Sequence, residues 1–434
     1  MQKTKVKERI RRGRAGEFLA LWDEAVLLQQ APTRGRRKKS PVEEVHLEVR
    51  NAKRSLRLIR EGQYTRAGQA LTSAGLAQQT RATMNAMKDL HPQGPPLLPS
   101  DTEPSSPPLR FSQERVLKGI KTFKAGSAPG PDGLRAEHLK VAVKLSPPNR
   151  TDKALEAITR LVNVLAAGGL PEAAAPYFCG ARLYAGNKKS GGIRPIAVGY
   201  ILRRLTSKCF SYVLADKAAR LLAPLQVGVG VPGGCDAVVH TVRAIVEDPN
   251  IPADTRSVLQ VDLINAFHSV DRATAYKEIR ELFPEVAKWL KSTYGTQPEL
   301  IFGDLIISSC QGFHQGDPLA CLFFAVVLHP IVKKIAMKVP ELLLNSWFLD
   351  DGNLVGRLED LIRAIKIIIQ EGPARGLILS TRSSVPRHKD PKSTIWNPDY
   401  TFTSPDPLGL GVRLVTEPGI VLLGSPIGSP RPHR

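Results

Sequence analysis

The sequence predicts a mixed α+β fold preceded by an all-helical, basic amino-terminal region, and three observations support this prediction. The first 90 residues combine Arg, Lys, Ala, Leu and Gln with apolar residues at helical spacing. Residues 110–380 alternate helical stretches with short apolar strands. Between these parts, residues 92–109 contain seven prolines, which exclude a helix or a central strand. We therefore expect a helical region at 1–91, a linker at 92–109 and the α+β part at 110–434.

The composition favours a folded chain that binds a polyanion. With 434 residues, 42% hydrophobic and 23% charged, the chain can bury the cores of two or three domains. Its formal net charge of +21 suits nucleic acid, because bound cations release the counterions of phosphates. A membrane surface is the competing polyanion. However, the sequence has no apolar run of about 18 residues and no amphipathic anchor beside its basic segments, so we expect no membrane partner.

The amino terminus is charged from the start and lacks the apolar core of a secretory signal, so we expect an intracellular protein, in the nucleus or the cytoplasm. Seven Lys and Arg lie within residues 1–14, and a second basic cluster lies at residues 34–39. Either cluster could contact phosphate or direct nuclear import, and a solvated charged face is an equal alternative. The cysteines lack metal-ligand spacing and are expected to be reduced core thiols: Cys179, Cys209, Cys235, Cys310 and Cys321.

Several shorter elements follow from local sequence. Residues 116–123 predict a short helix that ends at Gly126, and the Gly- and Pro-rich residues 127–133 predict a tight loop. Residues 381–399 carry Pro, Ser and charge and predict an irregular interruption. The residues from 419 onward predict a strand and a turn.

Three aspartates stand where a fold can bring side chains together. Asp262 ends the apolar strand 258–263. Asp350 and Asp351 interrupt a second apolar run, and we expect a hairpin turn there with positive φ at Gly352. Clustered carboxylates repel one another unless a cation joins them, so convergence would imply Mg²⁺. Two such ions would suit nucleotidyl transfer. Taken singly, an N-cap and an ordinary turn explain these residues as well.

Seven segments, in this order along the chain, resemble the motifs of reverse transcriptases of non-LTR (LINE-type) retrotransposons. The resemblance runs from about residue 110 to 428. The segments are an extension loop (Ser-Ala-Pro-Gly-Pro-Asp-Gly, 127–133), the fingers (191–199 with 202–205), the stretch 226–234, three palm motifs (261–267, 315–319 and 348–351) and a primer-grip hairpin (419–428).

The resemblance implies a right-hand polymerase, with an α+β palm built on an antiparallel sheet and with helical fingers. The implied reaction is attack of a DNA primer 3′-hydroxyl on the α-phosphate of a deoxynucleoside triphosphate, templated by RNA and assisted by two Mg²⁺ ions. The implied metal ligands are Asp262, Asp350 and Asp351.

The first palm motif implies nucleotide contacts. The backbone of Leu263 and Ile264 would touch the triphosphate, and Phe267 would lie under the sugar, where a ring excludes a 2′-hydroxyl. A core phenylalanine is the alternative for Phe267.

The second palm motif implies contact with the template and the incoming base. Gln315 would lie at the nucleotide, and Gly316 would let the backbone approach closely. We expect Asp317 as the N-cap of the following helix, Pro318 as its first residue and a kink at Pro330.

The fingers imply a basic hairpin tip that folds over the triphosphate, with Lys188, Lys189 and Arg194 as its cations. For the two lysines a solvated basic hairpin is the alternative. The primer grip would be formed by Leu423, Gly424 and Ser425.

The sequence also departs from the family. Arg382 stands where a lysine usually protonates pyrophosphate, so we expect Lys392, after an insertion, to take this role. Tyr200 replaces a common acid, without a physical explanation. No helical thumb, Cys/His cluster or endonuclease is recognisable, so a catalytically inactive fragment that binds nucleic acid is the alternative, and a maturase-like cellular factor a less favoured one.

Overall fold

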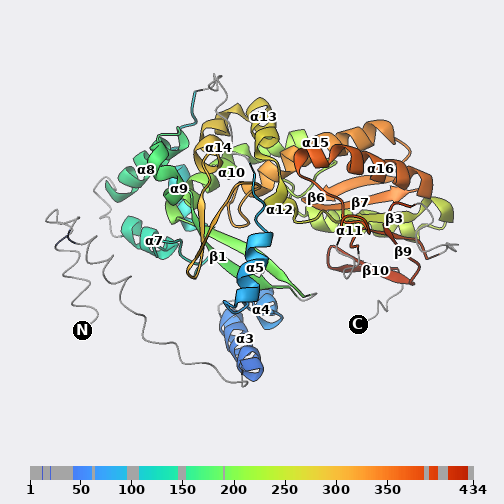
Figure 1. Cartoon of the computed structure of the whole chain (residues 1–434), viewed down its shortest axis with the longest axis horizontal. Coiled ribbons are helices and arrows are strands. Elements are labelled where there is room, and N and C mark those ends of the chain that lie inside the picture. Colours follow the sequence, from blue (N-terminus) through green and yellow to red (C-terminus); the bar gives the residue numbers. More distant parts are fainter. Residues whose placement is uncertain are drawn as a thin grey trace. The chain divides into compact units, whose positions relative to one another are not determined.

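The structure is a computed structural model (Figure 1), and it describes residues 12, 20, 43–60, 64–94, 107–144, 153–188, 191–385, 391–398 and 409–428. The chain forms two compact units, residues 1–75 and 76–434. Both amino-terminal basic clusters lie almost wholly outside the described residues.

The described residues of the first unit are mostly helical, as the sequence predicts. Its described helices are α3 (Glu43–Arg60) and α4 (Tyr64–Leu71). They share a small core of Leu58, Ala67 and Ala70. A side-chain bond from Asn51 to the Ser73 carbonyl (2.9 Å) ties the end of this unit back to α3.

The second unit begins before the expected linker. Residues 76–91, which the sequence places with the amino-terminal region, belong to this unit. Ala77 donates to the Ala185 carbonyl (2.8 Å), and Met87 of α5 (Arg81–Asp89) is fully buried in the core of the adjacent sheet. Within the expected linker, residues 95–106 lie outside the described residues.

The fingers contain a four-stranded sheet with the order β2-β1-β4-β5. β1 (Ala181–Asn187) and β2 (Ile193–Gly199) form an antiparallel hairpin, and so do β4 (Glu299–Phe302) and β5 (Leu305–Ser308). β1 and β4 pair in parallel.

Helices complete the fingers. Their apolar faces join one large core. They are α6 (Gln113–Lys121), α7 (Ala136–Lys144), α8 (Lys153–Ala166), α9 (Ala175–Phe178) and α10 (Ile201–Leu222). The predicted helix at 116–123 is thus confirmed. The loop 127–133 reaches Tyr200, because a Cβ on Gly130 would lie 2.8 Å from the Tyr200 backbone. The Tyr200 ring itself stacks on Phe178, with 5.6 Å between centroids.

The palm is a five-stranded sheet with the order β6-β7-β3-β8-β9. Its strands are antiparallel except β8 and β9, which are parallel. They are β3 (Ser257–Val261), β6 (Leu344–Phe348), β7 (Asp351–Gly356), β8 (Thr394–Trp396) and β9 (Arg413–Val415). β8 lies inside the stretch predicted to be irregular. The predicted interruption is therefore shorter than expected, and residues 386–390 within it lie outside the described residues.

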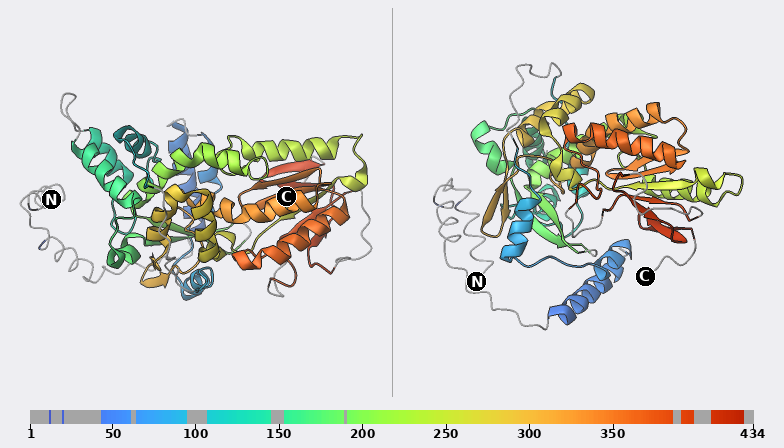
Figure 2. Two further views of the ribbon diagram at one scale, coloured as in Figure 1. Left: turned by 90° about the horizontal axis from the view of Figure 1, so that it is seen from above. Right: turned by 45° about the vertical axis from the view of Figure 1, so that its right-hand side comes forward.

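Alternate residues of the palm strands point to opposite faces of the sheet and pack into two separate cores. Leu259 and Val261 of β3 pack with helices α15 (Ala320–Lys338) and α16 (Leu358–Glu371). Val258 packs on the opposite face, against α11 (Gly234–Glu247) and the hairpin of β10 (Gly419–Leu422) and β11 (Ser425–Gly428). Figure 2 (right) shows the sheet between these two layers.

The remaining helices link fingers and palm. They are α12 (Ala266–Ser269), α13 (Arg272–Leu282) and α14 (Ala287–Tyr294), with short 3₁₀ turns at Glu172–Ala174, Ala253–Thr255, Pro284–Val286 and Pro373–Arg375.

Helix α15 corrects the prediction about its start. It begins at Ala320 with Leu319 in the cap position, so Asp317 is not its N-cap and Pro318 is not its first residue. The helix continues through Pro330. Among the described helices, only α15 is long and apolar enough to cross a membrane, and most of it is buried within the fold.

All five cysteines are free, in agreement with the prediction of reduced thiols. Cys179, Cys209 and Cys310 are buried, and Cys235 and Cys321 are partly exposed. Burial raises the pKa of the Cys209 thiol to about 12 and that of Cys179 to about 11. These thiols are therefore core residues rather than nucleophiles.

Candidate active site

Asp262 directly follows β3, as the sequence predicts. The β3–β7 register pairs Val261 with Gly352, so the next pair along the strands is Asp262 with Asp351. Because side chains alternate along a strand, Asp262 lies on the face of Val258, and Asp351 lies on the face of Val355, which is in the same core cluster as Val258. The two carboxylates therefore share the face that carries the β10–β11 hairpin.

The backbone of Asp262 is fixed from two further segments. The Ser380 amide donates to the Asp262 carbonyl (2.8 Å), and the Ser393 hydroxyl donates to the same carbonyl (3.1 Å). The Asp262 amide in turn donates to the Ser393 hydroxyl (3.1 Å). Nothing in the sequence distinguishes Ser380 and Ser393 from other serines, so sequence reasoning missed them.

Asp350 and Asp351 lie at the β6–β7 hairpin, but the turn differs from the expected one. Phe348 pairs with Asp351, so the two turn residues are Leu349 and Asp350. The positive φ (59°) is at Leu349 and not at Gly352. Gly352 is required for another reason, since a Cβ there would lie 2.7 Å from the Trp347 ring.

The three carboxylates influence one another electrostatically. Burial, followed by Asp350 and Asp262, raises the pKa of Asp351 to about 6. Burial also raises the pKa of Asp262, where Asp350 contributes, and the pKa of Asp350. Mutual repulsion of this kind is what a bound cation relieves.

Cations face these carboxylates. The Nζ of Lys392 lies 3.9 Å from Oδ1 of Asp262. Burial, then the nearby Lys392 and Arg194, lowers the pKa of Lys188, while Asp262 and Asp350 act in the opposite direction. Lys188 and Arg194 both lie at the β1–β2 hairpin, and the fingers hairpin thus points its charge at the palm carboxylates. Lys189 lies outside the described residues.

Of the two candidates for the proton donor, Lys392 is the one that contacts Asp262. Its amide donates to the Ser380 hydroxyl (3.0 Å), next to the segment that holds Asp262. Arg382 is anchored elsewhere, because its amide donates to the Gly411 carbonyl (2.7 Å).

The chemistry of the site suits a divalent cation, but the side chains do not form a closed metal cage. Carboxylate oxygens are ligands that Mg²⁺ prefers. A bound cation would also counteract the burial and repulsion that raise the pKa values of these three aspartates. Among the residues that the structure describes, however, no three Asp, Glu, His or Cys side chains lie close enough together to hold a metal ion. Catalytic Mg²⁺ sites usually take part of their coordination from substrate and water.

The nucleotide contacts expected from the first palm motif are only partly available. The Ile264 amide donates to the Ile378 carbonyl (2.8 Å), so this N–H is already used. Leu263 is buried and forms a bridge to Leu379. Phe267 is also buried, and it stacks on Phe324 with 4.7 Å between ring centroids. Phe267 is therefore part of the core, which is the alternative that the sequence left open for it.

Gln315 and Gly316 lie against the fingers. The Ala197 amide of β2 donates to the Gln315 carbonyl (3.0 Å). Gly316 has φ 136°, and a Cβ there would lie 2.3 Å from the Ala197 carbonyl oxygen. The close approach that requires a glycine here is therefore to β2, while Gly316 itself is exposed.

A buried polar cluster, which sequence reasoning missed, holds the segment before α15. The Tyr294 ring lies between the guanidinium groups of Arg203 (5.2 Å) and Arg272 (5.1 Å). The Tyr294 hydroxyl and Arg203 both donate to Oδ2 of Asp317, at 2.9 and 3.2 Å. Asp317 thus anchors the Gln315 turn to the fingers, and its Oδ1 also accepts from the amide of Leu319, directly before α15 (3.0 Å).

Arg272 holds the other half of the same segment. It donates to the Gly312 carbonyl (3.0 Å), the Gln311 carbonyl (3.1 Å) and the Ser309 hydroxyl (2.6 Å). Burial lowers its pKa to about 10, and these oxygens replace the water that the cation has lost.

A hairpin is present where the sequence predicts the primer grip. Leu423 and Gly424, both with positive φ, form the turn between β10 and β11, and Ser425 begins β11. The hairpin is attached to the palm by Gln260, whose Nε2 donates to the Val421 carbonyl (3.0 Å).

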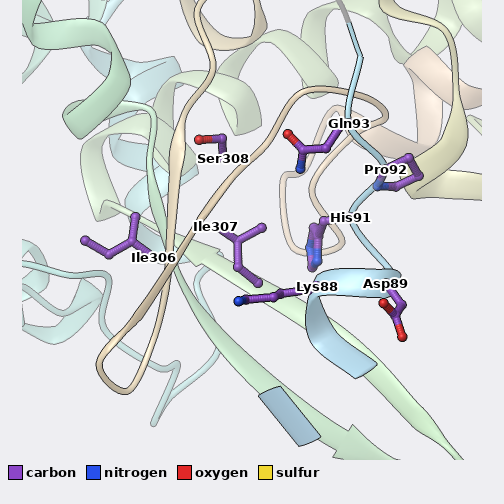
Figure 3. Close-up of a pocket in the computed structure, with 8 residues that line it drawn as sticks. All are labelled: Lys88, Asp89, His91, Pro92, Gln93, Ile306, Ile307 and Ser308. Carbon is purple, nitrogen blue, oxygen red and sulfur yellow. The ribbon is translucent and has the colours of Figure 1, made fainter. Parts of the chain in front are cut away.

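A separate hollow lies in the fingers (Figure 3). Its volume is about 470 Å³, and it lies between the end of α5 and β5. His91 and Ile307 are among its lining residues, and none of the three aspartates is.

The fold and the site together define a class of protein. A right-hand polymerase has a fingers sheet beside an antiparallel palm sheet. Its carboxylates lie at the end of the central palm strand and on the neighbouring hairpin, as they do here. Within this class, residues 186–383 match the family described as reverse transcriptase (RNA-dependent DNA polymerase). The match indicates a reverse transcriptase domain in this part of the chain, and thus a nucleotidyltransferase. The three aspartates lie inside the match, whereas Lys392 and the β10–β11 hairpin lie beyond it.

The chain is also similar to solved structures. One is telomerase from Candida albicans in complex with a TWJ fragment of telomeric RNA, with 12% identity and a TM-score of 0.41. The match covers 60% of this chain and 46% of that chain, so this chain spans about half the length of that one. No curated protein matches the sequence.

Proposed function

We propose that the chain is an RNA-directed DNA polymerase of the non-LTR (LINE-type) retrotransposon kind, acting by two-metal nucleotidyl transfer inside the cell. One observation carries this proposal. Asp262 and Asp351 share one face at a cross-strand pair, Asp350 adjoins them, and three cations from two other segments approach the same place. The seven ordered motifs support the retrotransposon subtype.

The roles of the residues follow from their chemistry. Asp262, Asp350 and Asp351 would hold two Mg²⁺ ions, and such ions would supply positive charge beside the primer hydroxyl and the pyrophosphate. Lys188 and Arg194 bind the triphosphate of the incoming deoxynucleotide. Lys392 gives its proton to the pyrophosphate. The β10–β11 hairpin supports the DNA primer, and Gln315 and Gly316 lie at the pair formed by the RNA template and the incoming base.

Primer extension tests this function. The full chain is incubated with poly(rA), an oligo(dT) primer, dTTP and Mg²⁺, and the product length is measured. We expect extension by the wild type, loss of extension with Asp350→Asn, and unchanged extension with Asp304→Asn. Asp304 is a matched control because it is exposed in the turn between β4 and β5.

A second candidate is a catalytically inactive fragment that binds nucleic acid. The observation that favours it is that the described carboxylates form no ready metal cluster. Under this candidate the wild type would not extend the primer, but it would still bind RNA with an affinity that falls steeply as salt rises.

A further inference from the structure

Gln226 lies directly behind the turn that carries Asp350. The segment around it runs beside β6, where the Val227 amide donates to the Trp347 carbonyl and the Trp347 amide donates to the Leu225 carbonyl, both at 2.8 Å. Gln226 is 1% exposed. A buried amide side chain must find partners for both its oxygen and its nitrogen.

The side chain of Gln226 finds these partners on a single residue. Its Oε1 accepts from the Leu349 amide (2.8 Å), and its Nε2 donates to the Leu349 carbonyl (3.0 Å). Oε1 also accepts from the Gly228 amide (2.9 Å). Gln226 therefore binds both polar backbone groups of Leu349 at once.

Leu349 adopts a backbone conformation that few residues with a Cβ adopt. Its φ is 59°, and left-handed geometry is unfavourable for a leucine. Leu349 and Asp350 are the two turn residues, so the φ of Leu349 sets the direction in which Asp350 leaves the strand. A residue that stabilises this φ acts directly on the position of a carboxylate.

Gly228 leaves room for the contact between Gln226 and Leu349, because it has no side chain. A Cβ on Gly228 would lie 2.7 Å from the Leu349 nitrogen and 2.9 Å from Oε1 of Gln226. Leu423 provides a comparison, because it has φ 48° in the two-residue turn of the β10–β11 hairpin. The described contact of its carbonyl is with the Cys235 thiol at 3.9 Å, which is much weaker than the paired amide bonds at Leu349.

We propose that Gln226 is a positioning residue for the polymerase reaction, which holds Leu349 in the left-handed conformation and thereby places Asp350 beside Asp262 and Asp351. This proposal rests on the proposed function. Gln226 itself touches neither substrate nor metal.

The test replaces Gln226 with methionine, which has a similar size but forms none of the three hydrogen bonds. On poly(rA) and oligo(dT), we expect Gln226→Met to lower kcat by about tenfold to a hundredfold, as a displaced catalytic group does. The KM for dTTP should stay within about twofold, because the nucleotide contacts are unchanged. Gln370→Met on the exposed face of α16 is the matched control and should leave kcat unchanged.

A rescue variant separates positioning from a merely structural role. Glycine adopts positive φ without a steric penalty, so Leu349→Gly in the Gln226→Met background should restore part of the lost kcat. Hydrogen–deuterium exchange gives a readout independent of activity. In Gln226→Met, exchange should rise in the peptide covering residues 347–352 and stay unchanged in α15.

Two results would overturn the proposal. One is a Gln226→Met variant with the kcat and exchange of the wild type. The other is a loss of kcat that Leu349→Gly does not relieve, together with faster exchange throughout the palm. If the wild type itself fails to extend a primer, the proposed function is wrong. The exchange of residues 347–352, with and without Leu349→Gly, then still decides whether Gln226 holds the turn.

Discussion

At the scale of single residues, the candidate site contains three carboxyl groups whose charged forms are disfavoured. Burial raises the pKa of each, and neighbouring carboxylates raise those of Asp262 and Asp351 further. The pKa of Asp351 in the fold is about 6, above its ordinary value of 3.8. A raised pKa means that the folded state binds the proton more tightly than the unfolded state does. The protonated residue therefore stabilises the fold below pH 4, and this contribution is lost as the pH rises through 6.

Asp351→Asn should consequently stabilise the metal-free protein at pH 8 and have little effect at pH 4. Allowing for solvent screening, we expect a gain of about 1 kcal/mol in the free energy of unfolding at pH 8. Denaturant unfolding in EDTA at both pH values measures it. The control Asp304→Asn should change nothing at either pH, and an Asp351→Asn variant that is less stable at pH 8 would contradict the prediction.

The buried Tyr294 hydroxyl allows a second prediction at this scale. Tyr294→Phe keeps the ring between the two arginines but removes the donor to Asp317 and the acceptor for the His314 amide (3.2 Å). We expect a loss of about 1–3 kcal/mol, because buried partners are left unsatisfied. Thermal or denaturant unfolding measures the change.

Two further variants provide a larger and a smaller expected loss of stability for comparison. Arg203→Met should cost more, about 3–5 kcal/mol, since it leaves the Asp317 carboxylate buried without its cation. Tyr177→Phe on exposed α9 should stay within about 0.5 kcal/mol of the wild type. Equal effects of Tyr294→Phe and Tyr177→Phe would show that the cluster does not stabilise the segment before α15.

At the scale of elements, the β6–β7 hairpin depends on a glycine under a tryptophan. Gly352→Ala would place a Cβ 2.7 Å from the Trp347 ring. Because the ring is fully buried and cannot move freely, we expect a loss of about 2 kcal/mol. Gly68→Ala is the contrasting variant, since nothing lies within 4 Å of its added Cβ in helix α4. It should be neutral or stabilise its helix by up to about 1 kcal/mol.

The elements also show what local sequence can predict. An apolar run ending in Asp262 predicts a strand end because both faces of the strand are buried, and the structure agrees. The sequence predicts positive φ at Gly352, but the structure has it at Leu349. The prediction is wrong because the position of the turn depends on which residues pair across the hairpin. The pair Phe348 and Asp351 fixes the turn at Leu349. Asp317 has the local signature of an N-cap, but its partners, Arg203 and Tyr294, are distant in sequence, and local reasoning could not find them.

At the scale of the whole molecule, the boundary of the polymerase unit lies at residue 76. Residues 1–91 share one helical, basic composition, so the sequence predicts one region there. Contacts divide it differently: Leu76 bridges to Gly186, and Asn265, a few residues after β3, donates to the Leu90 carbonyl (2.9 Å). The expected order of fingers and palm motifs, by contrast, was predictable, because it depends on seven segments and not on one.

This boundary predicts the effect of truncation. A chain that starts at Leu76 should unfold at nearly the same temperature as the full chain, whereas a chain that starts at Pro95 should unfold at a clearly lower temperature. The second truncation removes the fully buried Met87 and the buried His91, whose ring lies edge-on to His268 at 5.1 Å. Calorimetry of both chains measures the difference. Similar transitions in the two would contradict the prediction.

The bond between Leu90 and Asn265 also bears on how the chain acquires its fold. The two residues are 175 positions apart, and β1 must likewise wait for β4 before the fingers sheet has its middle pair. Closing such long loops is slow, because the contacts that offset the lost chain entropy form only after the loop has closed. During synthesis, helix α5 at the start of the unit is therefore made early but reaches its final contacts late. Fingers and palm should accordingly fold together in one cooperative step, after the ribosome has delivered Asn265 and β4.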